Sequence, residues 1–207
     1  MDNLVSKIEK LKKTDIKNKI DQRIKEFQSI SQKSKNQIFE ELCFCILTAN
    51  FNAEKTIQIQ NKIGESFLQD SEKKLATKLK KCGHRFPNKR AQYICESKKQ
   101  KNELYNIVEN EKEEKIREWL VNNIKGIGYK ESSHFLRNIG FQNIAIIDFH
   151  IVDLLFRYNL IKKPKTITKK RYLEIEEILK KIADRADVTL AELDLYLWYM
   201  ETGKILK

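Results

Sequence analysis

Proline, glycine and long apolar runs are scarce in this chain of 207 residues. It contains only 2 prolines and 6 glycines, whereas helix-favouring Lys, Glu, Leu and Ile are abundant. A chain so poor in helix-breaking residues is expected to be all-α. No apolar run reaches the roughly 18 residues of a membrane span, so we expect no contact with a membrane. The opening "MDNLVSKIEKLKK" also lacks the apolar core of a signal peptide and resembles an amphipathic helix.

Cysteine is also scarce, and its spacing excludes the usual metal motifs. The four cysteines, Cys43, Cys45, Cys82 and Cys95, form no C-x-x-C pair. Cys43 and Cys45 lie in an apolar run and are expected to be buried thiols. We therefore expect a reduced, cytoplasmic protein with no metal site and no iron–sulphur cluster.

Acidic residues are too few to balance the basic ones. Lys and Arg number 41 against 29 Asp and Glu, which gives a net charge of +12. The excess is spread along the chain, so it predicts a broad basic surface and favours nucleic acid as the partner. A solvated surface laced with salt bridges is the alternative interpretation.

The apolar pattern predicts a succession of helices without repeats or a low-complexity linker. The length fits one unit, 1–207, either as one domain or as two lobes around a cleft. Glycine closes one predicted helix at Gly83, and Thr189 with Glu192 forms a capping box that begins the last. The predicted helical segments cover residues 1–29, 36–48, 71–83, 90–108, 113–124, 170–186 and 189–203. Further helices are expected within 49–64, ending at Gly64, after the turn from Lys130, and after a cap at Asp148, and a loop over 84–90 holds Pro87.

The stretch "IKGIGYKESSHFLRN" places two glycines in a short turn between two helices. Gly126 and Gly128 allow a sharp turn and a close approach of another backbone. The amides of the turn and of the following helix point outward together and would bind a DNA phosphate without reading a base. An ordinary connection between helices remains an alternative.

Lys130 stands at the start of the second helix, where the positive end of the helix dipole normally attracts an acidic residue. The dipole and partial burial both disfavour the ammonium form, and a neutral amine can form a Schiff base with a sugar carbon. A surface lysine that contacts phosphate is the alternative.

Asp148 follows the apolar run "NIAII" and precedes a helical pattern. Its carboxylate is suited to stabilise a cationic sugar or to accept a proton from the attacking amine, and it also fits a simple helix cap. His150 is a candidate contact to phosphate, or an ordinary core or surface histidine.

The order of helix, "IKGIGYK", helix and "IIDFH" resembles the helix–hairpin–helix–Gly-Pro-Asp superfamily of DNA glycosylases. Lys125 replaces the usual proline of the hairpin and Ile146 stands two residues before Asp148, so the Gly-Pro element is absent. The resemblance implies that Lys130 is the nucleophile and Asp148 the assisting carboxylate. It also implies a bifunctional glycosylase with AP-lyase activity, because members without the lysine form no Schiff base at this position.

Other segments extend the resemblance. "ELCFCILTANFNAEKT" is similar to the helix and turn that enters the minor groove, which makes Asn50 a candidate wedge. "GHRFPNKRAQYI" is similar to the loop beside the cleft, where Arg85 and Phe86 would contact the opposite base. "KESSHFLRNIG", the short length and "LDLYLWYMETGKILK" resemble the archaeal-type, second family of 8-oxoguanine DNA glycosylases.

Three residues are candidates for base recognition. His134 lies one turn after Lys130 and either lines the base pocket or packs beside Phe135. Trp198 is a stacking candidate, although its helical spacing also fits a core role. The resemblance adds Lys207 at the end of the sequence, where fraying is the usual expectation.

The resemblance thus implies a helix–hairpin–helix glycosylase fold of two helical lobes around an active-site cleft. We expect one lobe over about 30–118 and the other over about 1–29 and 119–207, with the hairpin at 115–140. The implied function is excision of 8-oxoguanine from double-stranded DNA by a monomer associated with the nucleoid, without a cofactor. Two alternatives remain open: a glycosylase for oxidised pyrimidines, and a non-enzymatic DNA-binding module.

Overall fold

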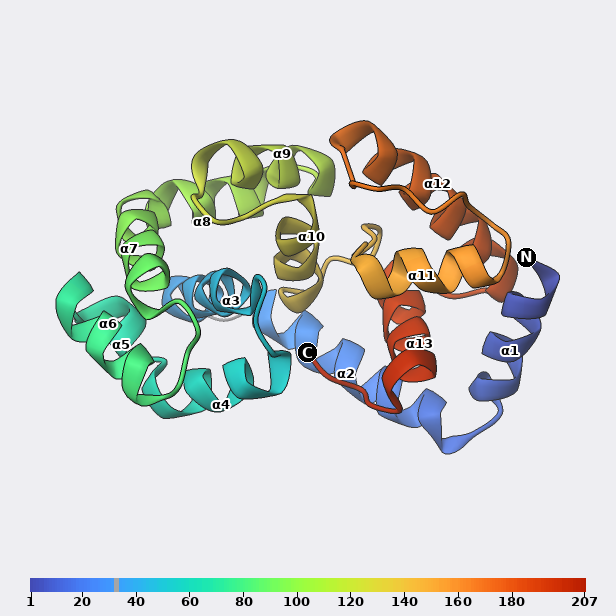
Figure 1. Ribbon diagram of the computed structural model, residues 1–207, viewed down its shortest axis with the longest axis horizontal. Helices are drawn as coiled ribbons and strands as arrows, with labels where there is room; N and C mark the ends of the chain where they lie inside the picture. Colours follow the sequence, from blue (N-terminus) through green and yellow to red (C-terminus); the bar gives the residue numbers. More distant parts are fainter. Residues whose placement is uncertain (32–33) are drawn as a thin grey trace.

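The computed structural model describes residues 1–31 and 34–207, and all regular structure in this part of the chain is helical (Figure 1). This finding confirms the all-α prediction. The helices are α1 (Asp2–Lys12), α2 (Asp15–Ser31), α3 (Lys35–Thr48), α4 (Ala53–Ile63), α5 (Ser66–Gln69), α6 (Glu72–Lys81), α7 (Pro87–Ser97), the 3-10 helix η1 (Lys98–Gln100), α8 (Lys101–Asn110), α9 (Glu113–Asn123), α10 (Tyr129–Asn138), α11 (Phe149–Arg157), α12 (Lys169–Ala186) and α13 (Leu190–Thr202).

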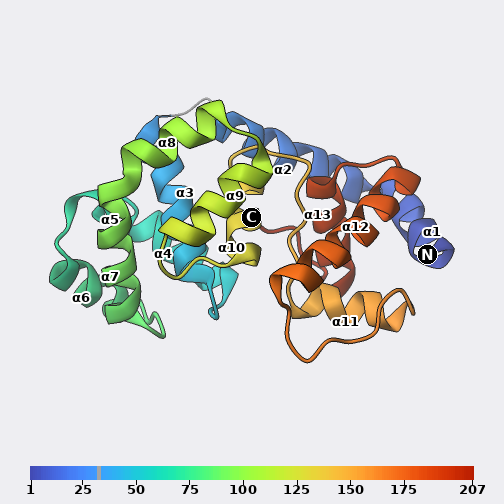
Figure 2. The same ribbon diagram turned by 90° about the horizontal axis from the view of Figure 1, so that it is seen from above.

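The helices form two groups with the carboxyl-terminal tail between them. Figure 1 shows α3 to α10 on one side and α1 with α11 to α13 on the other. Helix α2 runs along the base of the molecule from one group to the other, as the view from above in Figure 2 also shows. The tail after α13 ends close to α3 and α10, far from the amino terminus.

Each group has its own hydrophobic core. The first core surrounds α3, whose apolar sequence is buried on nearly every side, and it extends from Ile38 to Ile144. The second core is built by α1, α2, the segment from Ala145, and helices α11 to α13. Burial of this apolar surface drives both groups of helices to assemble.

The cores suggest a different boundary between the lobes from the one expected at residues 118 and 119. The apolar faces of α9 and α10 pack into the first core, through Leu120, Phe135, Leu136 and Ile139 among others. We therefore propose lobes of 34–144 and of 1–31 with 145–207, so that the whole hairpin belongs to the first lobe. From here on, first lobe and second lobe denote these two sets.

Local end signals place most of the helices as the sequence predicts. The Thr189 side chain accepts a hydrogen bond from the backbone N–H of Glu192, and Gly203 ends α13 in the left-handed region at φ +71°. Pro87 corrects one expectation, because it begins α7 and does not lie in a loop. A proline is favoured at this position, where its missing N–H would have no helical partner.

Among residues 1–31 and 34–207, no helix combines the length and the apolar character that crossing a bilayer requires.

Candidate active site

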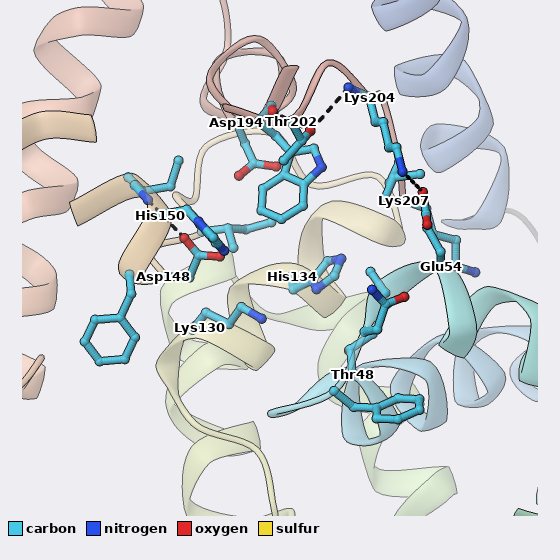
Figure 3. A pocket seen from close by; sticks show the side chains of 18 of the residues that line it. Thr48, Glu54, Lys130, His134, Asp148, His150, Asp194, Thr202, Lys204 and Lys207 are labelled. Carbon is cyan, nitrogen blue, oxygen red and sulfur yellow. Dashed lines mark hydrogen bonds and ion pairs between the residues drawn. The ribbon is translucent and has the colours of Figure 1, made fainter. Parts of the chain in front are cut away.

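A pocket of about 730 Å³ opens between the two lobes, and Figure 3 shows its lining. The first lobe contributes α10, the end of α3, the turn before α4 and the loop before α7. The second lobe contributes the start of α11, the inner face of α13 and the carboxyl-terminal tail. Eight of the site residues predicted from the sequence line this pocket: Asn50, Arg85, Lys130, His134, Asp148, His150, Trp198 and Lys207.

The glycine turn delivers Lys130 to the pocket. Gly126 has φ +82°, and a Cβ atom there would lie 2.4 Å from Tyr93 Cδ2, so both backbone conformation and space require glycine. Gly128 has an ordinary φ of −110°, and its N–H donates to Glu131 Oε2 at 3.4 Å. Neither glycine lines the pocket; they lie beside it in the turn that starts α10.

Lys130 is half-buried and largely free of partners. Its side chain is 28% exposed, and within the described residues its one ion pair is a loose contact of 3.9 Å with Glu131 Oε1. Figure 3 shows its amine directed into the pocket, toward the side on which His134 lies, with Asp148 on the other side of the lysine. An amine that is not engaged by a close carboxylate remains available to a substrate.

Asp148 enters the pocket from the opposite lobe. The preceding residues 144–147 are buried and extended, and Asp148 is the N-cap of α11. Its Oδ1 atom accepts a hydrogen bond of 3.0 Å from the backbone N–H of Ile151. The cap uses one carboxylate oxygen, which fixes the side chain and leaves the second oxygen for the pocket.

His134 is buried in the pocket wall and lies one turn after Lys130. Neither ring nitrogen has a hydrogen-bond partner within the described part of the chain. Burial, followed by the charges of Arg137 and Lys130, holds the pKa of His134 well below its ordinary value, although the adjacent Lys207 backbone opposes this shift. The ring is therefore neutral, with one nitrogen that donates and one that accepts.

Trp198 and His150 form a second wall. Their rings pack edge to face with centroids 5.6 Å apart, and His150 is exposed at the rim. The Nε1 atom of Trp198 is buried and has no partner among the described residues. An unpaired buried donor costs free energy unless a ligand supplies an acceptor.

Lys207 is held in place by the first lobe. Its amine forms an ion pair of 2.6 Å with the buried Glu41 and lies 4.5 Å from the centroid of the Phe44 ring. Lys204 in the same tail pairs with Glu54 at 2.5 Å. These contacts fix the tail across the pocket, contrary to the fraying that is usual for chain ends.

Asn50 and Arg85 lie at the rim. Asn50 is exposed and takes φ +57° in the turn after α3, a conformation that asparagine tolerates better than most residues. Arg85 also lines the pocket, and its guanidinium lies 5.0 Å from the Phe86 ring centroid. Phe86 is 39% exposed and lies outside the lining, at the N-cap of α7.

Sequence reasoning missed the ion pair of Arg137 and Asp194 on the inner pocket wall. The two side chains are buried and meet at 2.5 Å. Burial raises the pKa of Asp194 to about 6, and Arg137 only partly offsets this effect. A signal existed in the helical spacing, since Arg137 lies two turns after Lys130, and Asp194 interrupts the otherwise apolar "LAELDLYLWYM".

Phe149 was also missed. It lines the pocket at the start of α11 and is 62% exposed. A large apolar ring left in water beside a pocket is informative, because packing within the chain does not explain it.

The candidate nucleophile Lys130 and the candidate carboxylate Asp148 thus reach one cavity from different lobes. Comparison with known proteins shows the family to which the chain belongs. Residues 20–188 match the family model described as 8-oxoguanine DNA glycosylase (Ogg-HhH). The chain belongs to the 8-oxoguanine DNA glycosylase family.

Curated relatives align with nearly the whole length of this chain. A protein of Methanocaldococcus jannaschii named 8-oxoguanine DNA glycosylase/AP lyase is 54% identical over 206 residues, which is 99% of each chain. Relatives with the same name are 48% identical in Korarchaeum cryptofilum, over 100% of this chain and 99% of the relative, and 43% identical in Thermotoga maritima, over 99% of each.

Solved structures of the family have the same fold. The M. jannaschii 8-oxoguanine glycosylase/lyase in complex with a 15mer DNA containing 8-oxoguanine has a TM-score of 0.95 at 52% identity, over 99% of both chains. The T. maritima 8-oxoguanine DNA glycosylase has a TM-score of 0.94 at 42% identity, over 100% of this chain and 99% of its own. These similarities confirm the fold that the sequence predicted.

Proposed function

We propose that this protein is a bifunctional DNA repair enzyme that excises 8-oxoguanine from double-stranded DNA and then nicks the strand. The observation that carries the proposal is the pocket faced by a free amine from α10 and a capping carboxylate from α11. Membership of a family whose relatives are named 8-oxoguanine DNA glycosylase/AP lyase supports the lesion and both activities.

Lys130 is the proposed nucleophile. A base inside a duplex is out of reach, so the damaged nucleotide is first flipped into the pocket. The neutral amine of Lys130 attacks C1′ of the sugar, the bond from C1′ to the base breaks, and the base leaves with the bonding electrons and takes up a proton. Opening of the sugar ring then gives a Schiff base between Lys130 and C1′.

Asp148 is the proposed assisting carboxylate. Its oxygen that does not cap α11 stabilises the positive charge that develops on the sugar and accepts the proton lost by the attacking amine. β-Elimination follows: a proton leaves C2′, the bond from C3′ to oxygen breaks, and the 3′ phosphate departs. None of these steps uses a metal or a redox cofactor.

Residues around the rim are proposed to hold the DNA. The turn that holds Gly126 and Gly128 and the exposed His150 are assigned to phosphates. Asn50 is assigned to the gap left by the flipped nucleotide, with Arg85 and Phe86 beside the opposite base. The net charge of +12 supports a strong electrostatic contribution to this binding.

His134, Trp198 and Lys207 are proposed to select the base. Within the described part of the chain the buried Trp198 Nε1 atom has no hydrogen-bond partner, and the neutral His134 ring presents one donor and one acceptor. 8-Oxoguanine differs from guanine by an added N–H and an added oxygen, which can pair with such groups. We expect removal of Lys207 to lower excision of 8-oxoguanine, measured under single-turnover conditions, while binding to undamaged DNA is retained.

Borohydride trapping tests the proposed chemistry. The wild-type protein should cross-link covalently to a duplex containing 8-oxoguanine, and Lys130→Gln should abolish the cross-link. Lys115→Gln is the matched control, because Lys115 is an exposed lysine paired with Glu111 on the outer surface of α9. A protein that traps on no oxidised base would instead be a DNA-binding module.

A lesion panel tests the substrate. The rate of cutting should differ strongly among duplexes with 8-oxoguanine, thymine glycol or undamaged guanine. The duplex with 8-oxoguanine should be cut fastest. Faster release of thymine glycol would assign the enzyme to oxidised pyrimidines.

We also propose that the protein acts as a monomer on the DNA of the nucleoid. One chain supplies the whole lining of the pocket, so the site needs no second copy. Light scattering after size exclusion should give a mass near 24.6 kDa. A fluorescent fusion should colocalise with the nucleoid.

A further inference from the structure

A buried polar network lies behind the pocket, where it joins α9, α10 and α12 to the segment that carries Asp148. Its side chains are Arg117, Ser133, Tyr172 and Glu176, and each is almost fully buried. None of them lines the pocket, so none contacts a substrate there. Buried polar groups are costly unless they are satisfied, so a network of this size calls for an explanation.

An ion pair anchors the network. Arg117 donates to both carboxylate oxygens of Glu176, at 2.7 and 2.9 Å. Burial alone would lower the pKa of Arg117, but the hydrogen bonds and charge of Glu176 raise it, so the guanidinium is charged. The bidentate geometry fixes the Glu176 carboxylate in one orientation.

Glu176 and Tyr172 hold the backbone just before Asp148. Glu176 Oε1 accepts the N–H of Ala145 at 2.9 Å, and the hydroxyl of Tyr172 accepts the N–H of Ile147 at 3.2 Å. Both amides therefore face α12, while Ile146 between them lines the pocket.

Counting protons shows that the Tyr172 hydroxyl is fully used. Its single proton goes to the carbonyl oxygen of Ala145 at 2.7 Å, which can only accept. Its lone pairs then accept from Ile147 N–H and from the hydroxyl of Ser133 at 3.1 Å. Ser133 in turn accepts from Arg117 Nη1 at 3.4 Å.

Ser133 connects this arrangement to the nucleophile. It lies on α10 three residues after Lys130, so the same hydroxyl group of Tyr172 contacts the helix of Lys130 and the strand-like segment of Asp148. Lys130 and Asp148 belong to different lobes, and each lobe has its own hydrophobic core. Tyr129 of α10 packs against the second core, with its ring 5.5 Å from that of Tyr172, and the polar network adds directional hydrogen bonds to this contact.

We propose that Tyr172 is a positioning residue, which sets Asp148 relative to Lys130 through its hydrogen bonds to residues 145, 147 and Ser133. The inference rests on the proposed glycosylase function and adds a group outside the pocket to its machinery. Misplacement of a reacting group by about 1 Å lowers a rate by as much as 100-fold. We expect loss of the Tyr172 hydroxyl to lower base excision about tenfold.

A double-mutant cycle tests this positioning role. Tyr172→Phe is made in the wild-type protein and in Asp148→Asn, which removes the carboxylate and keeps an amide able to cap α11. Single-turnover excision of 8-oxoguanine is measured for all four proteins. If Tyr172 acts through Asp148, Tyr172→Phe should lower the rate about tenfold in the wild type and less than about twofold in Asp148→Asn.

Tyr196→Phe is the matched control. Tyr196 is also a buried tyrosine of the second lobe, but it lies on α13 and takes no part in the network. This control should excise at the wild-type rate. The affinity of Tyr172→Phe for 8-oxoguanine DNA, measured in a Lys130→Gln background, should also be unchanged, since the network touches no DNA.

The outcomes separate this inference from the proposed function. If Tyr172→Phe lowers the rate equally in both backgrounds, or does not lower it in the wild type, the positioning role is overturned. Excision by the Tyr196→Phe control would still support the glycosylase function. Absence of excision in the wild type and in Tyr196→Phe would overturn the glycosylase function itself. If Tyr172→Phe fails to fold, Ser133→Ala takes its place in the cycle and is expected to give a loss of about threefold, because it breaks only the link to α10.

Discussion

The pocket wall contains three ionisable residues whose pKa values differ from those in water. His134 is held neutral, whereas Arg137 and Asp194 form an ion pair. Burial lowers the pKa of Arg137 and raises that of Asp194, so both charges are kept against a cost of desolvation. Such groups concentrate at functional sites, where a ligand replaces water as their partner.

The raised pKa of Asp194 predicts a pH dependence of stability. Burial raises it from the ordinary 3.8 to about 6, so the folded protein binds the proton more tightly than the unfolded chain. This contribution is complete below about pH 4 and is lost as the pH rises through about 6. We expect the free energy of unfolding of the wild type, relative to Asp194→Asn, to fall by about 2.4 kcal/mol between pH 4 and pH 7.

Urea denaturation of both proteins at a series of pH values measures this difference. His134 titrates in both proteins, so its opposite contribution, which is lost as the pH falls below about 6.5, cancels in the comparison. A difference that stays constant, or that rises with pH, would contradict the raised pKa.

Individual residues were predictable from the sequence where they break a local rule. Lys130 at a helix start and Asp148 after an apolar run are visible without a structure, and both line the pocket. The ion pair of Arg137 and Asp194 was not visible, because its partners are 57 residues apart and meet only through packing of the lobes. Tyr172 was hidden for the same reason, since its partners lie on other elements of the fold.

The two glycines of the turn between α9 and α10 meet different structural requirements. Gly126 is required by its positive φ and by the nearby ring of Tyr93. Gly128 has an ordinary conformation, and a Cβ atom there would lie 3.4 Å from Glu131 Oε2, an ordinary contact with a flexible side chain. The sequence pattern G-x-G does not distinguish the two positions.

Alanine at each glycine tests this difference. Gly126→Ala should destabilise the protein by about 2 kcal/mol or more, because alanine is strained at this φ and also meets Tyr93. Gly128→Ala should cost less than about 1 kcal/mol, since the change only replaces one N-cap residue by a poorer one. Thermal and urea unfolding measure both variants.

Tyr93→Leu in the Gly126→Ala background separates the two causes. The double variant should recover the part of the lost stability that is due to the clash with Tyr93. It should keep the part that is due to the strained φ of residue 126. Equal destabilisation by Gly126→Ala and Gly128→Ala would show that neither φ nor Tyr93 sets the requirement.

Helix ends are set by local signals, whereas the grouping of helices into lobes is not, for a physical reason. A capping box such as Thr189 with Glu192, or a left-handed glycine such as Gly203, is a local interaction that the sequence contains in full. The grouping of α10 with α3 depends on which apolar faces meet, and residues such as Phe135 and Leu42 are far apart in the chain. Amphipathic spacing predicts a buried face without identifying its partner.

At the scale of the whole molecule, ion pairs join two separate hydrophobic cores. Five ion pairs of the described residues cross between the lobes, and one of them, Arg117–Glu176, is buried at both partners. The other four are Arg137–Asp194, Lys207–Glu41, Lys204–Glu54 and Lys169–Glu118. Removal of one partner from a buried pair leaves the other charge uncompensated, at a cost of about 3–5 kcal/mol. The lobes are therefore expected to unfold together, although each has its own core.

The two tryptophans allow this cooperativity to be measured, because Trp119 lies in the first lobe and Trp198 in the second. Trp198→Phe leaves fluorescence only from the first lobe, and Trp119→Phe leaves it only from the second. For each single-tryptophan protein, the urea transition followed by fluorescence should coincide with its transition followed by circular dichroism, as a two-state unit requires. Glu176→Gln should shift both transitions to lower urea and keep them coincident if other contacts still couple the lobes. A wild-type transition that splits by lobe would show instead that the ionic interface does not unite the two cores.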